Sequence, residues 1–311
     1  MAELAPDERI LETARNDPAR VDVETVVALF DARQGQVRNV ALRCLLFVAQ
    51  DDPDRVAAVN DRVIERLDDE FPVAGSTAAG VLARIARERP DAVHPARSKL
   101  VSKLDENPPL TGYRAARALV PLLEDDPAAF VSDADALLDV LVDPPDVWAP
   151  DTAELREMSD GKRQEITNRL SSRRDEIGRD KARTKGIREF VAHAIVEVSE
   201  REPDALVDRI DELAAALSIE PAIARAAIID AIANVASAEP AAVTPTVDAL
   251  VDRLEDDAEF VRAHAVRALG FAEATEAVEP LRTVATADVE TDLRELAAET
   301  ADWIADSNCD E

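Results

Sequence analysis

Apolar residues recur along the chain at an interval of 37 residues. Positions 41, 78, 115, 191, 228 and 265 hold Ala, Val or Ile, and the intervals between them are 37, 37, 76, 37 and 37. The apolar residues around each position are spaced as on one side of an α-helix. A second series keeps the same phase and consists of Leu67, Leu104, Leu141, Leu217 and Leu254. Because a repeat of this length is typical of stacked helix pairs, the pattern predicts helical hairpins that bury their apolar sides against one another.

Prolines mark the same period. They stand at positions 53, 90, 127, 203 and 240, each after charged or mixed residues that end one apolar pattern. Proline lacks an amide hydrogen, which costs nothing at the first position of a helix but breaks a helix interior. Each proline is therefore expected to end the first helix of a repeat and to open the second.

The two series predict an all-α, right-handed α-α superhelix of about seven helix pairs. The expected units lie near residues 1–35, 36–72, 73–110, 111–147, 186–220, 221–257 and 258–288. A further helix near 290–306 is expected to cap the array, with Leu293, Leu296 and Trp303 on its inner face. Terminal units of such arrays depart from the pattern because one of their faces meets water.

The run Val261-Arg262-x-x-Ala265, continued by Ala268-Leu269-Gly270, resembles the HEAT repeat, in particular the short form first noted in phycobilisome lyases. The resemblance extends over most of the chain and leaves out the stretch near 145–185. It implies an armadillo-like α-solenoid and a role in protein binding, as in scaffolds, adaptors, transport receptors and lyase subunits. It implies no catalytic residue, because one repeat architecture serves many functions.

Composition adds a strong acidic bias. The chain has 36 Lys and Arg residues against 65 Asp and Glu, a net charge of −29, and five of the 36 cations are lysines. This composition resembles that of proteins from salt-loving archaea, and the acids are spread through every repeat, as expected for adaptation of the whole surface. The start of the sequence lacks a basic and apolar leader, and no run of about 18 apolar residues occurs. The expected location is cytoplasmic, with no membrane partner.

The period is interrupted once, where an interval of 76 stands in place of 37. The extra residues divide the chain into N-terminal repeats at 1–147, a charged insertion at 148–185 and C-terminal repeats with a capping helix at 186–311. From 162 to 188 the sequence has ten Lys or Arg against four Asp or Glu, the reverse of the overall balance. The candidate interaction residues are Trp148, Lys162, Arg163, Arg169, Arg173, Arg174, Arg179, Lys181, Arg183 and Lys185.

Two interpretations of the insertion stay open. It is either a docking arm whose cations bind carboxylates or phosphates of a partner, or a solvated helical hairpin or loop without a binding role. Trp148 is expected to anchor its base on the array, or to be an exposed contact residue. Cations on the second helices, such as Arg62 and Lys99, are expected to form pairs with acids three or four residues away.

Residues typical of catalysis are sparse. The three histidines, His94, His193 and His264, lack the paired His-Glu motifs of HEAT-repeat deoxyhypusine hydroxylases, and no glycine-rich phosphate loop, GxSxG or HExxH motif occurs. No catalytic site, cofactor or metal is expected. Acids along the second helices disfavour binding of duplex nucleic acid by the array, which leaves the insertion as the possible contact with phosphates.

The sequence therefore favours a non-enzymatic protein-binding scaffold or adaptor, with the basic insertion as its candidate docking element. The alternatives are a nucleic-acid-associated protein that uses the insertion and a non-catalytic subunit of a lyase or another enzyme complex.

Overall fold

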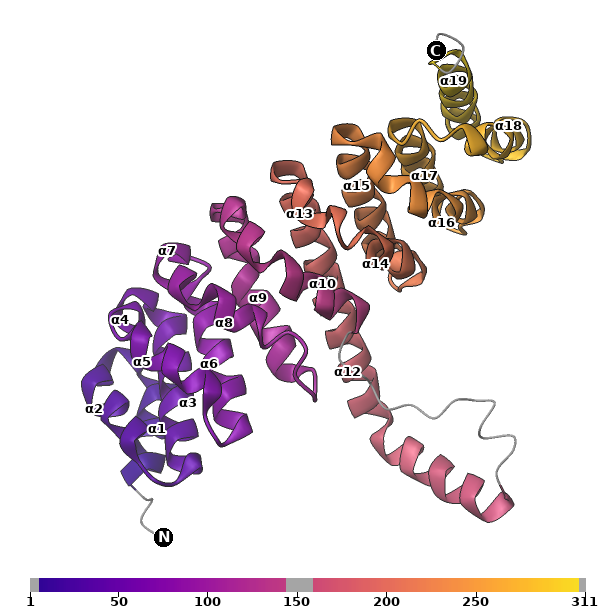
Figure 1. Ribbon diagram of the computed structural model, residues 1–311. Helices are drawn as coiled ribbons and strands as arrows, with labels where there is room; N and C mark the ends of the chain where they lie inside the picture. Colours follow the sequence, from indigo (N-terminus) through magenta and orange to yellow (C-terminus); the bar gives the residue numbers. More distant parts are fainter. Residues whose placement is uncertain (1–5, 144–158, 308–311) are drawn as a thin grey trace. The chain divides into compact units, whose positions relative to one another are not determined.

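A computed structural model describes residues 6–143 and 159–307, and within them every regular element is an α-helix or a short 3₁₀ helix (Figure 1). The expected all-α fold class is confirmed. Contacts divide the chain into two compact units. The first comprises residues 1–125 and 145–187, and the second comprises 126–144 and 188–311.

In the first unit, long helices alternate with groups of short ones. The long helices are α1 (Pro6–Asn16), α3 (Gly35–Asp51), α6 (Pro72–Ile85) and α9 (Leu110–Asp125). The short helices are η1 (Pro18–Arg20), α2 (Val23–Ala28), η2 (Leu29–Asp31), α4 (Pro53–Ala57), α5 (Asn60–Glu65), η3 (Arg66–Asp68), α7 (Pro90–Val93), η4 (His94–Ala96) and α8 (Arg97–Val101). Successive long helices pack against each other, α3 against α6 and α6 against α9.

The second unit repeats this alternation. Its short helices are η5 (Pro127–Asp133), α10 (Ala134–Val142), α13 (Asp204–Val207), α14 (Ile210–Ala215), η6 (Ala216–Ser218), η7 (Pro240–Thr246), α16 (Val247–Asp252), η8 (Arg253–Glu255) and η9 (Thr275–Ala277). Its longer helices after residue 201 are α15 (Ala222–Ala238), α17 (Glu259–Phe271), α18 (Val278–Ala287) and α19 (Thr291–Ser307). Helix α15 packs against α17, and α17 packs against α19.

The predicted periodic positions form the core. The first-helix series is fully buried and consists of Ala41, Ala78, Ala115, Val191, Ile228 and Ala265. The leucines of the second series are buried as well: Leu67, Leu104, Leu141, Leu217 and Leu254. Small residues at the first-helix positions let successive long helices approach closely, and the leucines fill the space beside the short helices.

The prolines stand where the sequence predicts, but the second helices are not single helices. Pro53 and Pro90 are the first residues of α4 and α7, and Pro203 precedes the first residue of α13. Each of these helices soon ends. At Val59 the backbone leaves the helical region, with φ −117° and ψ 18°, before α5 begins. The expectation of one continuous second helix per repeat is therefore wrong.

The insertion continues into the next repeat as one helix. Helix α12 runs from Asp160 to Arg201, 42 residues, so the expected boundary between 185 and 186 falls inside it. No proline occurs in the sequence between these two ends, so nothing in it forces the helix to stop at the expected boundary. The division of the chain into repeats, insertion and repeats stays a prediction, with the helix boundary moved.

The capping helix is present as α19, but one of its three inner residues is misassigned. Leu293 is buried and Leu296 is half-buried, whereas Trp303 is 48% exposed. Trp303 lies in the last turns of the final described helix, where no described helix follows to cover it.

Candidate protein-interaction surfaces

The structure places most of the expected docking residues on the amino-terminal part of α12. Trp148 lies outside the described residues, and so do the side chains of Arg163 and Arg169. Arg183 is half-buried. The other candidates are exposed: Lys162, Arg173, Arg174, Arg179, Lys181 and Lys185.

Some of these cations are paired with acids of their own helix. The Arg173 side chain donates to Glu176 at 3.0 Å, and this carboxylate raises the pKa of Arg173. Arg183 donates to Asp180 at 2.6 Å. Within the described residues, Arg174 and Lys181 have no carboxylate within 4.0 Å, and they stand seven residues apart on one side of the helix, with the half-buried Ile177 between them.

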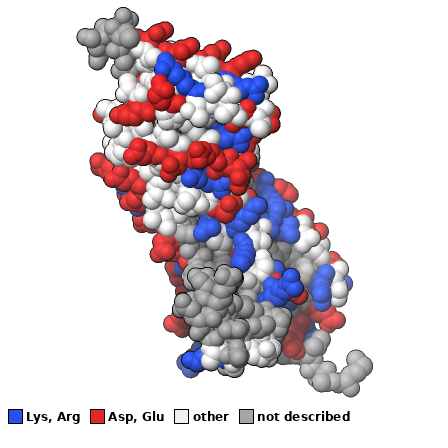
Figure 2. All heavy atoms as spheres, turned by 90° about the vertical axis from the view of Figure 1, so that its right-hand side faces the viewer, with Lys and Arg blue, Asp and Glu red and all other residues white. Residues whose placement is uncertain are grey.

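Among the described residues, α12 is open near Gly178 and closely packed near Gly186. A Cβ atom added to Gly178 would meet no atom of the described structure within 4 Å, whereas one added to Gly186 would lie 3.0 Å from the Tyr113 ring of α9. The helix is thus packed near residue 186 and accessible near residue 178. In Figure 2 Lys and Arg side chains gather in one area of this face, apart from a band of Asp and Glu side chains.

A further arginine contributes positive charge near the packed end of this segment. Arg114 of α9 donates to the Ser76 hydroxyl at 2.9 Å, and no carboxylate of the described residues pairs with it. Burial, and secondly the charge of Arg183, lower the pKa of Arg114. Between them, the neighbouring guanidinium groups of Arg114 and Arg183 have one paired acid, Asp180. Their remaining positive charge favours the approach of an anion.

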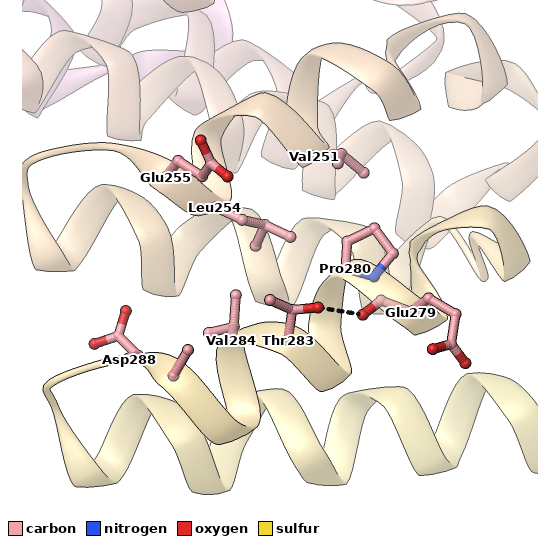
Figure 3. Close-up of a pocket in the computed structure, with 9 residues that line it drawn as sticks. Val251, Leu254, Glu255, Glu279, Pro280, Thr283, Val284 and Asp288 are labelled. Atoms are coloured by element: carbon pink, nitrogen blue, oxygen red, sulfur yellow. Dashed lines mark hydrogen bonds between the residues drawn. The ribbon is translucent and has the colours of Figure 1, made fainter.

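A groove lies between α16–η8 and α18 in the second unit, with a volume of about 580 Å³. Its lining is mostly apolar and includes Val251, Leu254, Pro280, Val284 and Ala287. In Figure 3 Leu254 and Val284 point toward each other from the two helices. Glu255 and Asp288 stand at one end of the groove and Glu279 stands at the other. The groove therefore combines an apolar floor with acidic ends.

The corresponding junctions of the first unit are closed by cations. The Arg62 side chain of α5 donates to Asp31 at 2.9 Å, and Lys99 of α8 lies 2.8 Å from Asp68. Hydrogen bonds from Lys103 and Lys99 hold the pKa of Asp68 below its usual value. These bonds join successive repeats.

The apolar and charge spacing did not predict these pairs between repeats. The expected pairing with an acid three or four residues away is present for Arg62, which lies 3.4 Å from Glu65, but Arg62 also binds Asp31 across 31 residues. The expectation is wrong for Lys99, whose acid is Asp68, 31 residues earlier. Arg209 combines both kinds of contact, because it binds Asp139 of α10 at 2.7 Å as well as Glu212. The repeat period offered a sign of these pairs between repeats, because the two acids, Asp31 and Asp68, stand 37 residues apart.

The histidines are each placed beside one acid. His94 lies 3.0 Å from Asp125 and His264 lies 2.5 Å from Asp230, both across repeats, and His193 is 3.9 Å from Glu197 of its own helix. Among the described residues, no three His, Cys, Asp or Glu side chains are arranged to hold a metal ion. In the same residues, no helix has both the length and the apolar character needed to cross a bilayer.

No protein-family model and no curated protein matches the sequence. Solved structures do match the fold. An archaeal HEAT-like repeats protein from Thermococcus onnurineus NA1 is 13% identical with a TM-score of 0.51, and the match covers 98% of this chain and 99% of that one. A designed armadillo repeat protein is 16% identical with a TM-score of 0.51, covering 81% of this chain and 100% of that one.

A chain from structural work on the interaction between cadherin and beta-catenin is 16% identical with a TM-score of 0.62. The match covers 95% of this chain and 55% of that one. At such identities the likeness defines the fold alone. The chain has the helical-repeat solenoid fold that HEAT-like and armadillo repeat proteins share.

Proposed function

We propose that this protein is a non-enzymatic scaffold or adaptor that binds another protein through the surface of its helical repeats. The repeated helix pairs supply a long surface of short helices, and repeat arrays of this kind bind along such surfaces. One structural neighbour comes from work on an interaction between two proteins, cadherin and beta-catenin. The acidic surface is part of the same proposal, as an adaptation of a cytoplasmic protein to high salt.

The docking element of the proposal is the segment 162–185 of α12, and its partner is an acidic protein surface. The observation that carries it is the pair Arg174 and Lys181, exposed cations that no described carboxylate neutralises. Ile177 lies between them, so the same face offers an apolar contact. Cations without partners in the free protein give up few intramolecular bonds on binding a carboxylate, and they also steer its approach.

Charge reversal tests this element better than deletion, because α12 continues into the core of the second unit. The variant Arg174→Glu with Lys181→Glu is expected to keep the helical circular dichroism of the wild type and to lose at least about tenfold in affinity for a labelled poly-glutamate peptide. Arg87→Glu with Arg267→Glu, which reverses two exposed arginines outside α12, is the matched control. Unchanged binding by the α12 variant would refute the docking role.

The second candidate function is contact with nucleic-acid phosphates through the same cations, favoured by Arg114 and Arg183 near the packed end of the segment. Affinity for single-stranded RNA or DNA would then fall steeply with salt. Retention of RNA that exceeds retention of poly-glutamate, and that disappears in the α12 variant, would favour this function. A role as a lyase subunit would instead show a chromophore in the purified protein.

A further inference from the structure

The acid at one end of the groove belongs to a repeat column in which Asp31 and Asp68 each bind a cation of the following repeat. Asp68 of η3 and Glu255 of η8 occupy equivalent repeat positions, four periods of 37 residues plus the 39 inserted residues apart. Asp68 lies 2.8 Å from Lys99 of the following repeat, and the Lys99 ammonium also donates to the Ile64 carbonyl at 3.2 Å. Val251 stands at the position equivalent to Ile64 and lines the groove.

The cation itself is missing at the groove. The residues that α18 presents there are Glu279, Pro280, Thr283, Val284 and Ala287. The nearby arginines are engaged elsewhere, because Arg282 donates to Glu279 at 2.8 Å and Arg253 lies 3.6 Å from Asp256. Within the described structure, Glu255 has no cation within 4.0 Å.

Two further carboxylates extend the acidic end along the same helix. Asp248 and Asp252 are exposed and precede Glu255 by seven and three residues, which places all three on one side of α16–η8. None of the three has a cation partner among the described residues. An acidic stripe beside an apolar floor matches a ligand with alternating cationic and aliphatic groups.

We propose that the α16–α18 groove binds a segment of a partner protein that inserts a Lys or Arg side chain at Glu255. The aliphatic stem of this side chain would lie on Leu254, Val284 and Pro280, and its charged head would reach the Glu255 carboxylate and the Val251 carbonyl. The partner thus supplies the cation that Lys99 supplies in the first unit. The groove and the α12 segment are formed by different residues, so each site can be tested without the other.

The test uses the full chain and a dye-labelled helical peptide of Lys and Leu, with a peptide of Glu and Leu as the probe of the α12 segment. The wild type is expected to bind the lysine peptide through the groove. Glu255→Lys removes the carboxylate, and Thr283→Lys places a lysine among the residues that line the groove. Each is expected to weaken binding at least about tenfold in fluorescence anisotropy, the factor that 1.4 kcal/mol represents.

Asp302→Lys, which replaces an exposed acid of α19, is the control with the same change of charge as Glu255→Lys and a larger one than Thr283→Lys. It is expected to keep the wild-type affinity within about twofold, a difference well below 1.4 kcal/mol. Equal losses of lysine-peptide affinity in all three variants would show that binding depends on net charge alone, and would overturn the proposal.

A second outcome concerns self-association. Sedimentation of the wild type alone shows whether a second copy occupies the groove through its own α12 cations. Self-association that Thr283→Lys abolishes would overturn the assignment to another protein. Loss of lysine-peptide binding in Thr283→Lys, with poly-glutamate binding retained, would support the groove independently of the α12 segment.

Discussion

Arg38 and Asp69 lie 31 residues apart in the sequence and are joined by two hydrogen bonds between successive repeats. The Arg38 Nε donates to Asp69 Oδ2 at 2.7 Å, and its Nη1 donates to the carbonyl of Ala32, six residues earlier. Arg225 repeats both contacts, with Asp256 and with the Ile219 carbonyl. One arginine thus ties the start of a long helix to the turn before it and to the equivalent turn of the next repeat.

Removing one such arginine should destabilise the whole protein. The Asp256 side chain is 3% exposed and the Arg225 side chain is 9% exposed, so Arg225→Met leaves a buried carboxylate without its main partner. We expect a loss of about 3 kcal/mol in the free energy of unfolding, measured with urea. Arg282→Met is the control, because its pair with Glu279 is exposed and contributes at most about 1 kcal/mol. Equal losses in the two variants would contradict this account.

The same bonds make stability depend on pH. Hydrogen bonds from Arg38, and secondarily from the Phe71 amide, hold the pKa of Asp69 below its usual value although burial opposes them. A lowered folded-state pKa stabilises the protein above the unfolded value of about 3.9, and this stabilisation is lost as pH falls through the folded pKa.

The test compares the wild type with Asp69→Asn. The difference in unfolding free energy should be constant above about pH 5 and should shrink steadily as the pH falls below about 4. Urea titrations at several pH values measure it. A difference that stays constant down to about pH 2 would show that the carboxylate charge of Asp69 does not contribute.

Two glycines should respond in opposite ways to the same substitution. A Cβ at Gly75 of α6 would lie 2.8 Å from the Leu67 carbonyl, so Gly75→Ala forces the helix to move and should cost about 1–3 kcal/mol. Gly178 of α12 has open space, and Gly178→Ala should instead raise helix stability by up to about 1 kcal/mol. Thermal unfolding followed by circular dichroism compares the two, and a loss in both would contradict the open placement of Gly178.

The fold was predictable because one period determines it. Every position of the first-helix series, from Ala41 to Ala265, is buried as the spacing indicates. The breaks in the second helices were not predictable from apolar spacing, because the buried Val56 and Val63 keep helical phase across the break at Val59. The reversed charge balance at 162–185 indicates a separate segment, whereas the helix α12 is continuous because no proline interrupts residues 160–201.

The candidate sites were predictable only in part. The basic charge of the α12 segment can be counted from the sequence and predicts exposed cations, and Arg174 is exposed. The groove is recognised because Glu255 lacks a cation partner among the described residues. This lack is apparent only by comparison with Asp31 and Asp68, which bind Arg62 and Lys99. Residues that bind across 31 positions are indistinguishable in sequence from those that bind across three, so the groove needed the structure.

The net charge of −29 predicts that salt stabilises the protein. Repulsion between exposed acids acts over a Debye length of about 10 Å at 0.1 M salt and about 3 Å at 1 M, so added salt removes it. Ion pairs such as Arg225 with Asp256 are buried and are screened less. We expect the unfolding temperature to rise with NaCl over this range. The rise should be smaller in the variant Asp248→Asn, Asp252→Asn and Glu255→Gln, which removes three exposed charges. A fall in unfolding temperature with salt would mean that attraction between paired surface charges outweighs repulsion.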